Sequence, residues 1–148
     1  AFDVSLRVSH MIDYINEVNR RLEESFPNMV NYIYGHMGDG NLHFLVCPGE
    51  GDNSLRHDVE ACVYEPLVEI AGSVSAEHGV GLEKKPWLNI SRSVEEIDLM
   101  RRMKLALDPK GILNPGKAIP TLNRCAEFGA MHVRSVLGKE TKPSLERF

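Results

Sequence analysis

The sequence predicts an α+β fold in which an antiparallel sheet carries two helices on one face. Apolar residues recur at every second position in some segments and at every third or fourth position in others, which is typical of strands and helices respectively. The expected order up to Glu77 is strand, helix, strand, strand, helix, strand. This order is the split βαβ pattern of ferredoxin-like domains. A C-terminal helix and an extended tail follow outside that unit.

The first two elements are a strand and an amphipathic helix. Residues 2–8 alternate apolar and polar side chains, which indicates a half-buried strand. Residues 10–25 place apolar side chains at helical spacing, with Ser9 as the expected N-cap. The sequence Phe26-Pro27-Asn28 ends this helix.

A hairpin and a second helix come next. Residues 30–36 and 42–47 are β-prone, and Asp39-Gly40 between them is a strong signal for a two-residue turn. The second helix runs from Val59 to Ile70 and contains Pro66, which should kink or split it.

The last predicted elements are a short strand and a helix. Residues 73–77 alternate small side chains and fit a fourth strand. Ser93 and Glu96 form a capping box that opens a helix ending near Leu107. This helix should present one apolar face, made by Ile97, Met100, Met103 and Leu107. We expect one domain over residues 1–120, and a tail over residues 121–148.

Composition excludes several classes of protein. The 148 residues suffice for one domain with a real core, and a hydrophobic share of 43% is ordinary for a globular protein. A net charge of −4 without a cluster of Lys and Arg argues against nucleic acid as a partner. No apolar run approaches the roughly 20 residues that a membrane-spanning helix needs. The three cysteines form no CxxC pair, so we expect reduced thiols.

Residues 35–43, with the sequence GHMGDGNLH, place two histidines around the predicted turn. If Asp39 and Gly40 are the central turn residues, His36 lies directly opposite His43. Such neighbours share a face of the sheet, with Cβ atoms about 4.5–5.5 Å apart. Two imidazoles so placed can bind one metal ion, at distances of about 2.0–2.1 Å. A plain cross-strand histidine pair is the alternative.

Glu77 and His78 are the next candidates. Glu77 ends a largely apolar short strand, and a buried carboxylate there would need a partner. The fourth strand of a ferredoxin-like sheet lies at an edge, so Glu77 can reach the hairpin only through sheet twist or at the strand ends. If it does, His36, His43 and Glu77 form a set that suits Zn, Fe(II) or Mn(II), and His78 is free to act as a base. A surface loop pair is the alternative for Glu77 and His78.

Three segments together resemble one family. Residues 35–43, residues 75–81 (SAEHGVG) and residues 107–117 (LDPKGILNPGK) are similar to the C-terminal domain of FAD-linked oxidases, the D-2-hydroxyacid dehydrogenases of the vanillyl-alcohol-oxidase superfamily. Residues 124–133 (RCAEFGAMHV) and 145–148 (LERF) are similar to the tail of the FAD-linked subunit of bacterial glycolate oxidase. The first two motifs, in this order and spacing, are the specific ones.

The resemblance implies roles for individual residues. His36 and His43 match the two metal-ligand histidines of the family motif, and Glu77 matches its carboxylate ligand. His78 matches the residue placed by the flavin ring and the substrate hydroxyl.

The resemblance also implies residues on the flavin side of the site. Asn114 matches a residue that contacts this side. Gly79 and Gly81 follow the His78 position and lack a Cβ, so the backbone there could approach the flavin closely. His78, Gly79, Gly81 and Asn114 are therefore the expected cofactor-binding residues.

The activity implied by the resemblance is the FAD-dependent oxidation of a small 2-hydroxy acid, such as glycolate or D-lactate. A divalent metal (Zn, Mn or Fe) would bind the substrate's hydroxyl and carboxylate oxygens and lower the pKa of the hydroxyl group. His78 would accept the hydroxyl proton, and the α-hydrogen would pass as hydride to the flavin.

The resemblance sets expectations about partners as well. The family places a separate FAD-binding domain and a carboxylate-binding Arg ahead of this region, so the chain should be a C-terminal part that is inactive alone. Other glycolate oxidase subunits and a second copy of the chain are further candidate partners. We expect a cytoplasmic location, or peripheral attachment to a membrane through partner subunits. Arg134-Ser135-Val136 stands where the family tail has a His-rich continuation.

Two other classes of function stay open at this point. A flavin-independent metal-binding or metallohydrolase domain would act with the metal alone. A non-catalytic interaction domain would lose no activity on His78→Ala in the full-length protein.

Overall fold

The computed structural model describes residues 1–47, 53–117 and 119–120. Its helices and strands are β1 (Phe2–Ser5), α1 (Met11–Ser25), β2 (Val30–His36), β3 (Asn41–Cys47), α2 (Arg56–Tyr64), α3 (Leu88–Ser91) and α4 (Val94–Leu107). Short 3-10 turns lie at Val8–His10, Met37–Asp39, Asn53–Leu55, Glu65–Leu67 and Lys85–Trp87. The tail expected over residues 121–148 lies outside the described residues.

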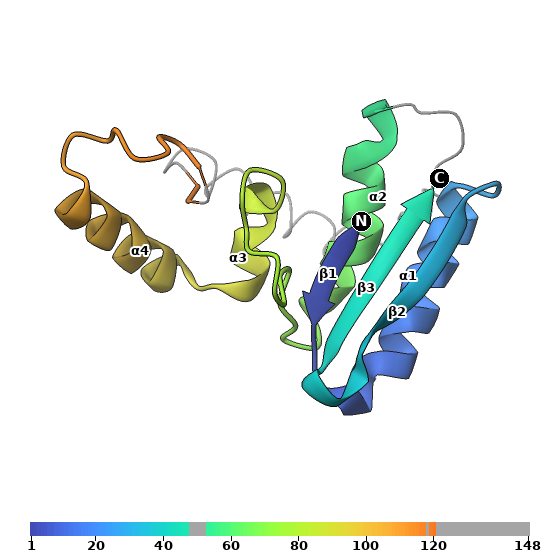
Figure 1. Ribbon diagram of the computed structural model, residues 1–148. Helices are drawn as coiled ribbons and strands as arrows, with labels where there is room; N and C mark the ends of the chain where they lie inside the picture. Colours follow the sequence, from blue (N-terminus) through green and yellow to red (C-terminus); the bar gives the residue numbers. More distant parts are fainter. Residues whose placement is uncertain (48–52, 118, 121–148) are drawn as a thin grey trace, which may run out of the picture.

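The three strands form one antiparallel sheet in the order β1-β3-β2. Helices α1 and α2 cover one face of this sheet, and within the described part of the chain no helix covers the other (Figure 1). The predicted α+β class, with an antiparallel sheet and helices on one face, is therefore confirmed.

The core lies between the sheet and the two helices. The fully buried side chains of Val4 on β1 and Phe44 on β3 point towards α1, whose buried residues are Met11, Tyr14, Val18 and Leu22. The Tyr14 ring packs edge-on against Phe44, with ring centroids 5.8 Å apart. Its hydroxyl donates a hydrogen bond to the backbone oxygen of Val63 on α2, at 2.7 Å. This contact joins both helices to the sheet.

The predicted fourth strand is reduced to a single bridge. Ser73 pairs with Ser5 at the edge of β1, which is where a fourth strand would lie in the predicted topology. Residues 74–77 then leave the sheet. The reason is that the Asp3 carboxylate accepts hydrogen bonds from the backbone N–H groups of residues 76–78, so these groups do not continue the ladder.

The predicted hairpin register is wrong by two residues. His36 lies opposite Asn41, and His43 lies opposite Tyr34. The connection is not a two-residue turn, because the 3-10 turn at Met37–Asp39 comes first and Gly40 then adopts a left-handed φ of 71°. A shift of two residues keeps side chains on their face of the sheet, so both histidines still project from the same side.

The helix boundaries agree with the sequence in part. Pro66 splits the second helix as predicted, because α2 ends at Tyr64 and a 3-10 turn follows. The capping box of Ser93 and Glu96 at the start of α4 is present. The N-cap of α1 is His10 and not Ser9, because a 3-10 turn precedes the helix.

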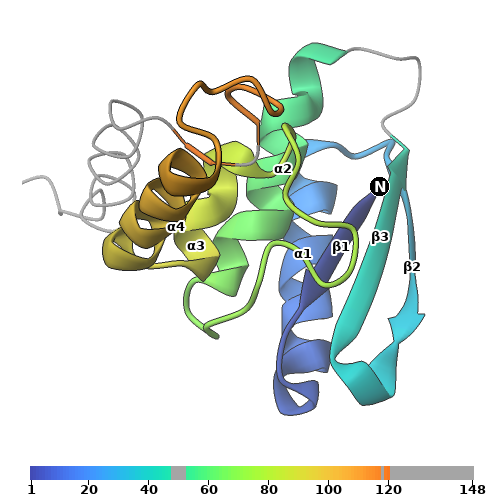
Figure 2. The same ribbon diagram turned by 60° about the vertical axis from the view of Figure 1, so that its left-hand side comes forward.

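Helix α4 follows α3 along the chain and lies away from the sheet (Figures 1 and 2). Of its predicted apolar face, Ile97 is buried, whereas Met103 and Leu107 are exposed. The predicted apolar face is therefore buried only near the start of α4, and its second half extends past the elements that bury the first turn.

Candidate functional site

The open face of the sheet carries the polar residues from which the site is built. Asp3 on β1, His43 on β3 and Tyr34 on β2 are neighbours in register, so their side chains form a row across the sheet. His36 projects from the same face one row further on, opposite Asn41. Alternation along each strand turns the neighbouring residues towards the core instead.

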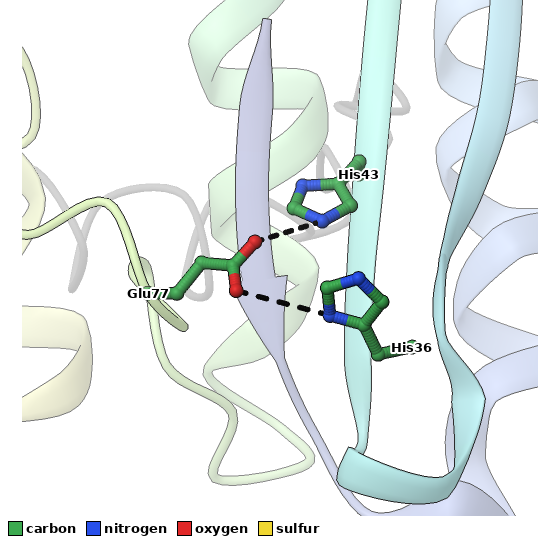
Figure 3. A group of neighbouring side chains, drawn as sticks. All are labelled: His36, His43 and Glu77. Atoms are coloured by element: carbon green, nitrogen blue, oxygen red, sulfur yellow. Dashed lines mark ion pairs between the residues drawn. The ribbon is translucent and has the colours of Figure 1, made fainter.

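Glu77 reaches this face from the segment that leaves the sheet after Ser73. Figure 3 shows its carboxylate pointing at both imidazoles. One oxygen, Oε1, lies 3.2 Å from His43 Nε2, and the other, Oε2, lies 3.8 Å from His36 Nδ1. The two rings meet edge to face, with centroids 5.5 Å apart. One donor atom from each of the three residues lies within 4.8 Å of the others, so the structure brings the sequence-predicted set together.

His78 lies against this set. Its ring stacks on that of His43 at a centroid distance of 5.4 Å and an interplanar angle of 24°. Its Nε2 is 3.6 Å from Glu77 Oε1, and its Nδ1 is 3.4 Å from Asp3 Oδ1. The His78 side chain is 59% exposed. A small molecule can therefore reach it from solvent.

Asp3 and Lys84 are residues of the candidate site that the sequence did not reveal. Asp3 reads as the polar residue of an alternating strand, and Lys84 as a solvated residue at a helix start. Both are buried, and they form an ion pair across 81 residues of chain. Burial lowers the pKa of Lys84 to about 8, so its ammonium group still carries its charge at neutral pH beside the carboxylate. No local pattern signals such a partner.

Asn41 is a further residue of the site that the sequence left in the turn. Its side chain is buried, and its Nδ2 lies 3.4 Å from His36 Nδ1. Its Oδ1 is buried and has no hydrogen-bond partner among the described residues. A buried amide oxygen without a partner is uncommon, and a bound ligand or ordered water is the usual explanation.

Gly79 and Gly81 border a pocket of about 320 Å³ that Asp3, His78 and Lys84 also line. Both glycines have left-handed φ values, 75° and 55°, and a Cβ added at either would meet open space. The structure therefore places the two glycines next to His78 with an unobstructed backbone.

Asn114 lies further along, in the loop that follows α4. Its φ is 47°, and its backbone oxygen accepts a hydrogen bond from Lys117. Lys85 Nζ donates to the backbone oxygen of Gly116 at 2.7 Å, which ties this loop to the segment that follows Gly81. Among the described residues, no hydrogen bond or ion pair joins Asn114 to His36, His43, Glu77 or His78.

These features define a class of protein: a small α+β domain whose open sheet face presents two imidazoles and a carboxylate beside a third, accessible imidazole. The chain belongs to the family described as FAD linked oxidases, C-terminal domain, which matches residues 1–118.

Individual relatives agree with the family. The chain is 45% identical over 120 residues to "D-2-hydroxyglutarate dehydrogenase, mitochondrial" of Bos taurus, covering 81% of this chain and 22% of that protein. It is 43% identical over 131 residues to "Glycolate oxidase subunit GlcD" of Escherichia coli strain K12, covering 86% and 26%. It is 39% identical over 126 residues to "Putative D-lactate dehydrogenase C713.03, mitochondrial" of Schizosaccharomyces pombe, covering 80% and 24%. The chain thus spans about a quarter of the length of these relatives.

None of the helices within residues 1–47, 53–117 and 119–120 has the length and apolar character that a membrane-spanning helix needs.

Proposed function

We propose that this chain forms the substrate-binding part of a FAD-dependent oxidoreductase that oxidises a small 2-hydroxy acid. The observation that carries the proposal is the convergence of His36, His43 and Glu77 beside the accessible imidazole of His78. Membership of the FAD-linked oxidase family supports the flavin. Relatives named for glycolate, D-2-hydroxyglutarate and D-lactate support the substrate class, since all three compounds carry a hydroxyl group next to a carboxylate.

The donor set fits a divalent metal ion. Two imidazole nitrogens and one carboxylate are ligands that Zn, Mn and Fe(II) accept, and they leave coordination positions open. His36, His43 and Glu77 would hold the ion. Bound there, it would supply a Lewis acid for the hydroxyl and carboxylate oxygens of the substrate. Asn41, whose Nδ2 lies 3.4 Å from His36 Nδ1, also has a buried Oδ1 without a partner among the described residues, which fits a bound ligand nearby.

His78 is the proton acceptor that the chain itself provides. Its Nε2 faces Glu77, and its ring is accessible from solvent, so a hydroxyl group bound at the donor set would lie within its reach. A positioned imidazole that takes up the proton contributes about 10²–10⁴-fold to such a reaction. The flavin, when bound, supplies the acceptor for the α-hydrogen.

The open face of the sheet offers a surface for the flavin-binding domain. Tyr32, Tyr34 and Leu45 are exposed on the face that carries His43. A patch of exposed apolar side chains typically marks an interface. We assign this face to the FAD-binding domain, with the unobstructed backbone of Gly79 and Gly81 next to the flavin.

Metal binding by the purified chain tests the donor set. We expect one zinc ion per chain by elemental analysis, and a loss of affinity of at least about 100-fold in His43→Ala and Glu77→Ala, because each removes a direct ligand. The control is His57→Ala, since His57 lies against Trp87 at 5.3 Å and outside the set. Equal zinc affinity in all four proteins would contradict the metal assignment.

Turnover tests the flavin chemistry. In a hybrid, this chain replaces the matching segment of the E. coli glycolate oxidase subunit, and dye reduction is followed with glycolate, D-lactate and D-2-hydroxyglutarate. We expect turnover of at least one acid and a kcat lower by about 10²–10⁴-fold in His78→Gln. A flavin-loaded hybrid that oxidises none of the three would contradict the substrate class, and an unchanged kcat in the variant would contradict the role of His78. The chain without its flavin domain should reduce no dye.

A further inference from the structure

Asp3 is the residue on which the Glu77–His78 segment is fastened to the sheet. Its side chain is fully buried on β1, opposite His43. Its Oδ2 accepts three backbone hydrogen bonds, from Ala76 at 2.9 Å, Glu77 at 2.8 Å and His78 at 3.0 Å. One carboxylate oxygen therefore fixes the backbone that carries both the proposed metal ligand and the proposed base.

The other oxygen of Asp3 faces two cationic or donating groups. Lys84 Nζ forms an ion pair with Oδ1, and it also donates to the Asp3 backbone oxygen at 3.2 Å and to Ser75 Oγ at 3.1 Å. His78 Nδ1 lies 3.4 Å from the same Oδ1. Lys84 thus balances the buried charge of Asp3. The Oδ1 atom also lies close enough to the imidazole to accept a hydrogen bond from it.

We propose that Asp3 is a positioning residue that selects the tautomer of His78. In this arrangement the Nδ1–H of the imidazole would be donated to Asp3 Oδ1, 3.4 Å away, which leaves the lone pair on Nε2, the nitrogen that faces Glu77. Stacking on His43 holds the ring plane, so the carboxylate needs to fix only which nitrogen bears the proton. The catalytic meaning of this tautomer rests on the proposed function, because only a base at this position makes use of a free Nε2.

If Asp3 had a purely structural role, the tautomer of His78 would stay the same in any folded variant that keeps the loop anchor. In Asp3→Asn the side-chain oxygen can still accept the backbone N–H groups, but the amide –NH₂ then faces His78 and the Lys84 ammonium. Replacing Lys84 as well, by Met, removes the unbalanced buried charge that would otherwise destabilise the protein. The double variant Asp3→Asn/Lys84→Met therefore keeps the loop anchor while reversing the hydrogen bond to His78, because an amide –NH₂ donates to Nδ1.

Imidazole tautomers are read directly from ¹⁵N chemical shifts. We label the histidines of the full chain with ¹⁵N, remove metal ions with a chelator, and record long-range ¹H–¹⁵N spectra at a pH where the imidazoles are neutral. We expect the Nδ1–H tautomer of His78 in the wild type, and a shift to the Nε2–H tautomer in Asp3→Asn/Lys84→Met. Assignment uses His78→Gln, which removes one signal.

Two results would overturn this proposal. One is a wild-type His78 that is mainly the Nε2–H tautomer, which needs no variant to fold. The other is a folded double variant whose tautomer matches that of the wild type. Neither result tests the flavin chemistry or the substrate class, because the samples contain no flavin and no substrate. Conversely, an active His78→Gln hybrid would refute the base and leave the tautomer assignment standing.

Discussion

The glycines around the tip of the hairpin differ sharply in what their positions require. At Gly40, φ is 71° and an added Cβ would lie 2.4 Å from the backbone oxygen of Leu6. At Gly35 an added Cβ would lie 2.4 Å from the backbone oxygen of Asn41. At Gly38 an added Cβ meets nothing within 4 Å. Only Gly40 and Gly35 exclude a side chain. Gly35 directly precedes His36, and Gly40 precedes Asn41, which lies opposite His36 in the sheet.

Gly40 and Gly38 should respond differently to replacement by alanine. Gly40→Ala should lower the free energy of unfolding by about 1–3 kcal/mol, because a left-handed residue with a side chain is strained and its Cβ would collide with Leu6. Gly38→Ala should stay within about 0.5 kcal/mol of the wild type. Urea unfolding followed by circular dichroism measures both, and equal losses would contradict the geometry of the tip.

Single residues show how far the sequence could lead. His36, His43 and Glu77 were named from their motifs, yet the direct cross-strand pairing expected for the two histidines is not what joins them. A register offset of two residues leaves each side chain on the same face of the sheet, so the two histidines still lie close together despite the wrong register. The sequence does not reveal Asp3 and Lys84, because each is buried in an ion pair with the other, 81 residues away in the chain.

At the scale of the element, α1 shows how surface charges attach a helix to its neighbour. Glu17 accepts hydrogen bonds from Arg20 and Arg21 one turn further along the helix. Arg21 also reaches Glu65, in the 3-10 turn that follows α2. Hydrogen bonds from Arg20, and then from Arg21, lower the pKa of Glu17 to about 2.

A pH dependence of stability follows from this pKa. Since folding lowers the pKa of Glu17, the stabilisation is complete above the unfolded value of 4.5 and is lost as the pH falls towards about 2. Wild type should exceed Glu17→Gln by at most about 1 kcal/mol at neutral pH, because the group is largely solvent-exposed, and the difference should shrink over that range. Glu23→Gln, on the exposed side of the same helix, is the control. Chemical unfolding at several pH values checks this, and a difference that persists at pH 2 would refute it.

The fourth strand shows why some elements escape sequence patterns. Alternating small residues over 73–77 are compatible with a strand, and the segment does begin one at Ser73. What ends it is competition for backbone N–H groups by a carboxylate more than 70 residues earlier in the chain. The spacing of apolar residues indicates which face of an element is buried. It does not show that a distant carboxylate will bind the backbone N–H groups of that element.

Across the whole molecule, the site joins β2, β3 and the segment after the Ser5–Ser73 bridge. The sequence predicted the fold class because local patterns determine which faces must be buried. It did not predict that α4 would extend past the core, because the spacing of Ile97 and Leu107 is the same whether or not a partner covers the last turns.

Because the ligands come from separate elements, a metal ion should stabilise the folded chain as a whole. At a free zinc concentration of about 100 times Kd, the gain is about 2.7 kcal/mol, which corresponds to a rise in Tm of about 5–10 °C for a chain of this size. Thermal unfolding with and without zinc measures it, and His43→Ala should show no rise. A rise of the same size in that variant would place the binding elsewhere.

The anchoring of residues 76–78 by Asp3 also has a consequence for the order of folding. The three hydrogen bonds close loops of 73 to 75 residues, and such closures cost more chain entropy than the local contacts of the hairpin or of α1. We expect the hairpin to form early and the Glu77–His78 segment to dock late, when β1 has already joined β3. A fluorescent zinc probe would then report full-affinity binding only at the last event of refolding, when Glu77 joins the two histidines.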